Sequence, residues 1–248
     1  MKLSLVIPMY NEEEIVEDTA RRLKEGLDLF LPNDYEIIFS DDGSTDLCVE
    51  KLLNLSLPNV KVLKGEKNCG KGSAVRRGAL VAEGDYVMFT DCDLAYGVDI
   101  IELALKEAEK NKDKGMMVGS RRLAKDGYTG YSLSRKIISK AYISFLSFIA
   151  GGLPVSDSQT GCKIFTRKTV QRIFPLCEVD RFAFDLEIIL FAKNMEIGIG
   201  EFPVTVINNR PSSIHFVRDS LRMIRDVLKM KKRIRRKIKE NVNQECKP

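Results

Sequence analysis

The stretch Asp85–Leu94, DYVMFTDCDL, decides the fold of this chain. It opens with a short apolar run, Tyr86–Phe89, which is typical of a strand buried on both faces of a parallel sheet. The stretch closes on two carboxylates, Asp91 and Asp93. Because ligands of open α/β sheets bind outside the carboxyl ends of the strands, we expect both acids to lie at a binding site.

These two acids need a counter-charge, because unpaired buried carboxylates are costly, and no basic residue stands beside them in the sequence. A divalent cation that holds a diphosphate would supply it, since Mg²⁺ typically binds one or two carboxylates together with phosphate oxygens. The Asp-x-Asp pattern alone is weak evidence, because it arises easily by chance in a chain with 35 acidic residues.

The composition predicts one large globular domain, with or without an appendage. The chain has 248 residues, of which 44% are hydrophobic, so it can build a full core. Its six cysteines include no CxxC pair, which favours reduced thiols over a disulfide framework or a zinc site. The single histidine, His215, leaves little material for a histidine metal site or a Ser-His-Asp triad. We expect no signal peptide, because Met1–Pro8 is a strand-like run that ends in Pro. We expect no transmembrane helix, because no run of 18 or more uncharged apolar residues occurs.

The net charge of +5 is distributed unevenly along the chain. Residues 222–239 contain ten basic residues and one acid, so the rest of the chain is mildly acidic. A basic tail of this kind indicates an anionic partner, either a membrane surface or a nucleic acid. Aromatic residues that could stack on bases are almost absent after Phe216, which argues against nucleic acid.

Strands and helices alternate through the first half, which predicts parallel strands with crossover helices. Apolar runs predict strands over Leu3–Ile7, Tyr35–Ser40, Val60–Leu63 and Met116–Gly119. Asn11 can cap a helix that carries Glu12, Glu13 and Glu14 in its first turn and runs to about Phe30. A second helix is expected from about Gly70 to Glu83.

Two other nucleotide sites are disfavoured. The spacing of Gly65, Gly70 and Lys71 resembles the start of a phosphate-binding P-loop, but Gly72 stands where Ser or Thr is needed. The glycine fingerprint of dinucleotide-binding folds is absent after the first strand.

Four stretches in this order and spacing, LVIPMYNEE, FSDDGSTD, GKGSAVRRGA and TDCDL, resemble the nucleotide-sugar half of family 2 glycosyltransferases. Farther on, VGSRR, SDSQTGCKIF and RFAFDLEIILFA resemble the polyprenyl-phosphate branch of that family, which contains dolichyl-phosphate glucosyltransferases and mannose synthases. The resemblance implies an α/β fold of the GT-A type, with a mostly parallel central sheet flanked by helices and C-terminal amphipathic interfacial helices. We expect a catalytic domain over residues 1–215, divided at about residue 95 into a donor half and an acceptor half. A basic membrane-interface helix and tail would follow over residues 216–248.

The resemblance also implies roles for individual residues. Pro8, Tyr10 and Glu12 would line the base and ribose, Asp41 would bind the base, and Asp42 would support that loop. Donor binding would further involve Lys71, Asp91 and Cys92. Asp91 and Asp93 would hold Mg²⁺ or Mn²⁺ and, with Asp185, form the catalytic set. Mannose synthases of this branch tend to carry Gln where this chain has Ala95, which favours glucose and leaves the metal one protein ligand fewer.

In the acceptor half, the resemblance places Arg121, Arg135, Asp157 and Gln159 at the acceptor phosphate. Arginine suits this task because its guanidinium binds phosphate in a bidentate manner. Asp185 and Glu187 lie two residues apart in FAFDLEIIL, so on a helix their side chains point about 200° apart and only one can face the site.

Two segments could reach a membrane. The apolar segment 137–153 is too short to span a bilayer, so it is either a core helix or an interfacial one, and the resemblance favours the interface. Val217, Leu221, Ile224 and Leu228 recur at helical spacing, and Val227, Ile234 and Ile238 continue an apolar stripe among basic residues. This pattern fits an interfacial helix, or a charged helix that packs on the body. Cutting the chain after Arg218 is expected to release it from vesicles and leave nucleotide affinity nearly unchanged.

The sequence therefore predicts a metal-dependent, inverting transfer of a hexose from a nucleotide diphosphate sugar, UDP-glucose or GDP-mannose, to a polyprenyl or dolichyl phosphate. The enzyme would act peripherally at the cytoplasmic face of a membrane with an anionic surface, without binding nucleic acid. The alternatives are a soluble sugar or diacylglycerol as acceptor, a sugar nucleotidyltransferase, and a nucleic-acid-binding protein.

Overall fold

The computed structural model describes residues 1–127, 144–145, 147–181, 183–207, 227, 229–230, 232–234 and 236–238. Within them, seven strands form one sheet in the order β3-β2-β1-β4-β6-β5-β7. β6 runs antiparallel to both of its neighbours, and every other pairing is parallel. The strands are β1 Leu3–Met9, β2 Tyr35–Asp41, β3 Val60–Leu63, β4 Tyr86–Phe89, β5 Met116–Ser120, β6 Lys163–Thr166 and β7 Ile199–Pro203.

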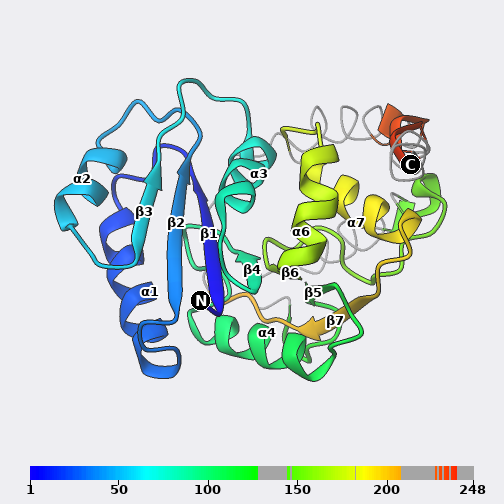
Figure 1. Ribbon diagram of the computed structural model, residues 1–248, viewed down its shortest axis with the longest axis horizontal. Coiled ribbons are helices and arrows are strands. Elements are labelled where there is room, and N and C mark those ends of the chain that lie inside the picture. The colour runs from blue at the N-terminus through cyan, green and yellow to red at the C-terminus, as the bar shows by residue number, and fades with distance from the viewer. Residues whose placement is uncertain are drawn as a thin grey trace, which may run out of the picture.

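Helices cover both faces of this sheet (Figure 1). On one face lie α1 (Val16–Phe30), α2 (Cys48–Leu55) and α4 (Asp99–Lys110). On the other lie α3 (Lys71–Val81), α6 (Arg167–Ile173), the short 3₁₀ turn η1 (Phe174–Leu176) and α7 (Phe184–Asn194). Alternate side chains of each strand pack against the two helix layers, because successive side chains of a strand point to opposite faces. Leu5 and Ile7 of β1 thus pack under α1, and Val6 packs under α3.

The first helix begins later than the sequence predicted. α1 starts at Val16, so the acids in its first turn are Glu17 and Asp18. Asn11 does not cap it, because its backbone is left-handed with a φ of 54° and its carboxamide oxygen accepts a hydrogen bond from the Thr45 N–H at 2.8 Å. Asn11 therefore ties the loop after β1 to the loop after β2, and the prediction of a cap was wrong.

The first strand is longer than predicted, since β1 continues through Pro8 to Met9 opposite Asp41 of β2. The pairing of β1 with β4 ends at Val6 opposite Phe89. Pro8 therefore lies where β1 has a partner on one side only, and such a position tolerates a residue without an N–H. The extension carries Pro8 and the residues after it to the carboxyl edge of the sheet.

Candidate active site

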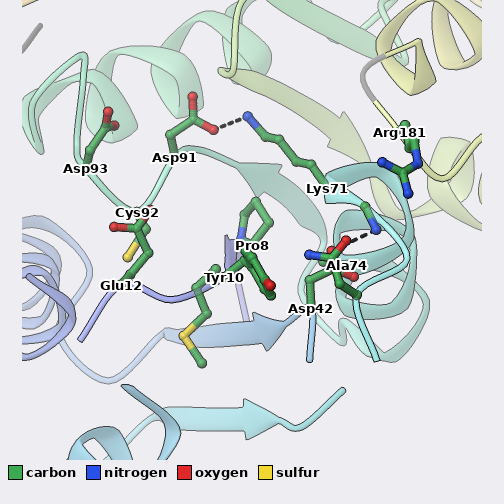
Figure 2. A pocket seen from close by; sticks show the side chains of 13 residues that line it. Pro8, Tyr10, Glu12, Asp42, Lys71, Ala74, Asp91, Cys92, Asp93 and Arg181 are labelled. Atoms are coloured by element: carbon green, nitrogen blue, oxygen red, sulfur yellow. Dashed lines mark hydrogen bonds and ion pairs between the residues drawn. The ribbon is translucent and has the colours of Figure 1, made fainter. Parts of the chain in front are cut away.

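A pocket of about 400 Å³ opens at the carboxyl ends of β1, β2 and β4 (Figure 2). The end of β1 and the loops after these three strands form its wall, together with the loop before α3, the start of α3 and the loop before α7. Of the residues that the resemblance assigned to the donor or the metal, all but one line it. They are Pro8, Tyr10, Glu12, Asp42, Lys71, Asp91, Cys92 and Asp93.

The exception is Asp41, which is completely buried behind the pocket. Its carboxylate accepts hydrogen bonds from the N–H groups of Gly43, Ser44 and Gly65 at 3.0–3.2 Å. Asp41 therefore holds together the loops after β2 and β3. This is the supporting role that the resemblance implied for Asp42. Asp42 is the member of the pair that reaches the pocket.

Asp42 organises the loop that leads into α3. Its carboxylate accepts the N–H groups of Cys69 at 3.1 Å and Gly70 at 2.7 Å. Gly70 has a φ of 121°, a backbone conformation that residues with a Cβ rarely adopt. This turn begins α3 at Lys71, so the lysine side chain extends into the pocket.

Lys71 and Asp91 form an ion pair across the pocket (Figure 2). Burial works to lower the pKa of Lys71, but the carboxylates of Asp91 and Asp185 outweigh it and raise the pKa. The Asp91 carboxylate packs against the backbone of Gly161, where an added Cβ would lie only 2.7 Å from the Asp91 Cγ and 2.9 Å from Oδ1. Asp93 accepts the N–H of Ala95 at 3.0 Å, which fixes one of its oxygens.

The pocket side chains fit Mg²⁺ or Mn²⁺ bound together with a diphosphate. Among the described residues, no group of three or more His, Cys, Asp or Glu side chains could hold a metal ion. Asp91 and Asp93 supply carboxylate oxygens, which these hard cations prefer, and phosphate oxygens and water can complete the shell. Glu12 and Asp42 add negative charge to the same pocket, so a bound cation would be stabilised electrostatically.

The side chains of Asp185 and Glu187 point in different directions and have different partners, as their spacing on a helix predicts. Asp185, at the start of α7, is buried and pairs with Lys163, which also donates to the Thr160 carbonyl at 2.6 Å. Burial raises the pKa of Asp185, although Lys163 and Lys71 work against it. Asp185 thus lies behind the pocket and close enough to Lys71 and Asp91 to affect their electrostatics. Glu187 is buried elsewhere, against the backbone before α7.

The acceptor-side residues that the structure describes, Arg121, Asp157 and Gln159, lie outside the lining of this pocket. Arg121, directly after β5, forms a bidentate ion pair with Asp157 at 2.7 and 2.9 Å. The Gln159 N–H donates to the same carboxylate at 3.4 Å, and the Gln159 side-chain nitrogen is buried with no partner among the described residues. The structure therefore brings Arg121, Asp157 and Gln159 together, while Arg135 lies outside the described residues.

Sequence reasoning missed Arg181, which lines the pocket from the loop before α7 (Figure 2). It is the second cation of the pocket, besides Lys71, among the described residues. The signal was present, since Arg181 opens the stretch RFAFDLEIILFA, but a lone arginine before a helix predicts no direction for its side chain.

The apolar stripe of the C-terminal segment packs on the body where it can be described. Val227 and Ile234 are 0% and 1% exposed and belong to the same core cluster as α3 and α7. The expectation that these two residues form an interfacial surface was wrong, because the protein core buries them. The positions 217, 221, 224 and 228 lie outside the described residues.

The apolar segment 137–153 is described only at residues 144–145 and 147–153. Phe145 is half exposed, and Phe148 is 83% exposed, while Ala150 is buried in the core. In the part of the chain that the structure describes, every helix is too short or too polar to span a bilayer.

Residues 4–174 match the family model described as Glycosyl transferase family 2, and the chain belongs to this family. It is 32% identical to a Dictyostelium discoideum protein named dolichyl-phosphate beta-glucosyltransferase, over 92% of this chain and 73% of that protein. It is 35% identical to the Drosophila melanogaster protein of the same name, over 82% of this chain and 66% of that protein. The chain thus spans about two thirds to three quarters of these relatives.

Solved structures of glucosyl-3-phosphoglycerate synthase from Mycobacterium tuberculosis are similar in fold. The complex of that enzyme with Mn²⁺ and UDP-glucose matches with a TM-score of 0.69 at 17% identity, over 92% of this chain and 77% of that chain. The complex with Mg²⁺ and UDP matches with a TM-score of 0.65 at 18% identity, over 92% and 77%. The prediction of a GT-A-like α/β fold with a mostly parallel sheet is confirmed.

Proposed function

We propose that this glycosyltransferase moves glucose from UDP-glucose to a polyprenyl or dolichyl phosphate and inverts the anomeric centre. The observation that carries the proposal is the similarity over most of the chain to two proteins named for this acceptor and sugar. Ala95, at the position where mannose synthases of the branch tend to carry Gln, supports glucose over mannose.

The donor occupies the pocket at the carboxyl ends of β1, β2 and β4 in this proposal. Pro8, Tyr10 and Glu12 lie on its β1 side, where the nucleoside would sit. Lys71 and Arg181 place two positive charges in the same pocket, where they can bind diphosphate oxygens.

Asp91 and Asp93 would hold Mg²⁺ or Mn²⁺, which when bound supplies positive charge to stabilise the leaving diphosphate. Gly161 sets the position of the Asp91 carboxylate from one side and Lys71 from the other. Asp185 acts from behind the pocket, where its negative charge stabilises the ammonium groups of Lys163 and Lys71.

The acceptor phosphate needs positioning more than activation. A phosphate monoester has its second pKa near ~6, so it is largely ionised at neutral pH and can attack without a strong general base. Asp157 holds the Arg121 guanidinium rigidly at the carboxyl end of β5, and this arrangement would orient the phosphate for attack on the anomeric carbon.

A lipid acceptor requires the enzyme to work at a membrane surface. The exposed Phe145 and Phe148 supply apolar side chains for insertion, and the basic residues of 222–239 supply attraction to anionic lipid. We place the protein peripherally on the cytoplasmic face, in keeping with its unpaired described cysteines.

The test is an assay of the purified chain with radiolabelled UDP-glucose or GDP-mannose against polyprenyl phosphate, glucose or diacylglycerol, each with Mn²⁺, Mg²⁺ or EDTA. We expect a β-linked glucosyl lipid phosphate, seen by NMR of the product, only with UDP-glucose, polyprenyl phosphate and metal. Transfer to glucose or diacylglycerol in preference to the lipid phosphate would overturn the acceptor, and release of pyrophosphate would indicate a nucleotidyltransferase.

A further inference from the structure

The short segment 177–181, between η1 and α7, reaches the donor pocket at one end. Arg181 lines the pocket, and the residue before it is fixed to α3. The Asp180 carbonyl accepts the Ser73 N–H at 3.1 Å, and the Asp180 carboxylate pairs with Arg76 at 2.6 Å. The segment also packs tightly on the start of α3, since a Cβ at Gly72 would lie 2.5 Å from the Val179 carbonyl oxygen.

The other end of this segment is held by a carboxylate from α7. Glu187 is completely buried, and one of its oxygens accepts the N–H groups of Glu178 at 3.0 Å and Val179 at 2.8 Å. These bonds fix the backbone immediately before Asp180 and Arg181. Glu187 therefore fixes the segment at Glu178 and Val179, while the contacts with α3 fix it at Asp180.

The counter-charge of Glu187 comes from the C-terminal segment of the chain. Arg233 pairs with the second oxygen of Glu187 and also binds the Glu178 carboxylate at 3.1 Å. Lys237, one turn later, pairs with Glu178 and donates to the Leu176 carbonyl at 3.0 Å. Ile234 is buried between these contacts, so the described residues 232–234 and 236–238 are fixed by both packing and charge.

In this arrangement, the buried carboxylate of Glu187 depends on Arg233 for its counter-charge. Burial raises the pKa of Glu187, while the Val179 amide and Arg233 work against that rise. Without Arg233, Glu187 would keep a buried charge lacking its guanidinium partner, or take up a proton and weaken its hold on the two amides. Either outcome loosens the segment that carries Arg181.

We propose that Arg233 is a positioning residue for donor binding, which acts through Glu187 and Glu178 to order the segment 177–181 and so place Arg181 in the pocket. The proposal rests on the proposed function in one respect, that the pocket binds a nucleoside diphosphate. It also changes the expectation for truncation: cutting the chain after Arg218 removes Arg233, so it should weaken nucleotide binding as well as membrane binding.

The experiment measures the affinity of the full chain for UDP in the presence of Mn²⁺, by calorimetry at a temperature where each variant is folded. We expect Arg233→Met to weaken UDP binding by about tenfold or more, as does Arg181→Met, since charged hydrogen bonds of an arginine commonly contribute that much. Combining the two changes should weaken binding no further than Arg181→Met alone, because both act through one contact. The matched control is Lys232→Met, which removes an exposed cation next to Arg233 and should change the affinity less than twofold.

Two further variants separate positioning from general destabilisation. Arg233→Lys keeps the charge but cannot bridge two carboxylates in the same way, so it should bind UDP with intermediate affinity. Glu187→Gln added to Arg233→Met removes the unpaired buried charge, keeps an oxygen for the two amides, and should restore much of the lost affinity. This pair of variants also decides the question if Arg233→Met alone does not fold.

The possible outcomes are distinct. If the wild-type chain does not bind UDP, the proposed function fails. If the wild type binds UDP and Arg181→Met weakens binding, while Arg233→Lys and Arg233→Met bind like the wild type, the positioning role is refuted. It is equally refuted if the losses from Arg233→Met and Arg181→Met multiply, because they would then be independent.

Discussion

The change Gly161→Ala tests how the Asp91 carboxylate is positioned. An alanine Cβ at this position would lie 2.7 Å from the Asp91 Cγ, whereas ordinary contacts of this kind begin at 3.4 Å. The nearest carboxylate oxygen would be closer still, so the Asp91 side chain must move by roughly 1 Å or the backbone before β6 must yield. A misplacement of about 1 Å at a reacting centre can cost 10²-fold in rate.

We therefore expect Gly161→Ala to lower turnover about 100-fold, which corresponds to about 3 kcal/mol of barrier. The assay is steady-state transfer from UDP-glucose to a short polyprenyl phosphate over a Mn²⁺ series. Overpacking also destabilises proteins, typically by about 1–3 kcal/mol, so thermal unfolding must show that each variant is folded at the assay temperature.

The control compares two variants: the single change Asp91→Asn, and the double variant that combines Gly161→Ala with Asp91→Asn. If the alanine acts by displacing Asp91, the double variant should be no slower than Asp91→Asn alone, because the carboxylate is already lost. Turnover of Gly161→Ala within twofold of wild type, or losses that multiply in the double variant, would refute this reasoning.

Three further outcomes are expected. Asp93→Asn should lower turnover at least ~100-fold without a change in melting temperature, because it removes a proposed metal ligand; unchanged turnover in saturating Mg²⁺ and Mn²⁺ contradicts this. Burial works to raise the pKa of Asp157, but Arg121 outweighs it and holds the pKa below its usual value. The stability from this pair is thus present above about pH 4 and lost as the pH falls through the folded-state pKa. Asp157→Asn should flatten the acid decline of the melting temperature, and parallel curves would disprove that link. Phe148→Ser should weaken sedimentation with mixed neutral and anionic vesicles, whereas Leu29→Ser, at a residue 87% exposed on α1, should not; equal losses would exclude a specific contact.

The parallel half of the sheet was predictable because its signals are local. β1, β2 and β4 are buried by helices on both faces, so their sequences are short apolar runs that stand out from their neighbours. β6 gave no such signal of direction. Its four residues, Lys163–Thr166, include a buried lysine, and nothing in them indicates that the strand runs antiparallel.

Pairing between distant charged residues was beyond the sequence. Arg121 and Asp157 were both assigned to the acceptor phosphate, and 36 positions separate the two residues that bind each other. Asp41 and Asp42 are adjacent and identical, yet one is buried under three amides and the other faces the pocket. The choice depends on loops that meet only after folding.

The C-terminal stripe shows a different limit of sequence reasoning. An apolar helix face meets the same physical need against lipid or against a protein core, so Val227 and Ile234 have the same spacing in either case. Their burial on the body, together with the ion pair of Arg233 and Glu187, settles the matter for those residues.

The reversed direction of β6 has a consequence for how such a protein can diversify. Lys163, the first residue of β6, lies opposite both Phe89 and Val118. The chain therefore leaves the sheet at the carboxyl end of β5 and returns to it beside that same end. Arg121 and Asp157 join the two ends of this excursion. Under the proposed function, substitutions beside this ion pair would alter the acceptor site, while the strands at the donor pocket and Gly161 would stay as they are.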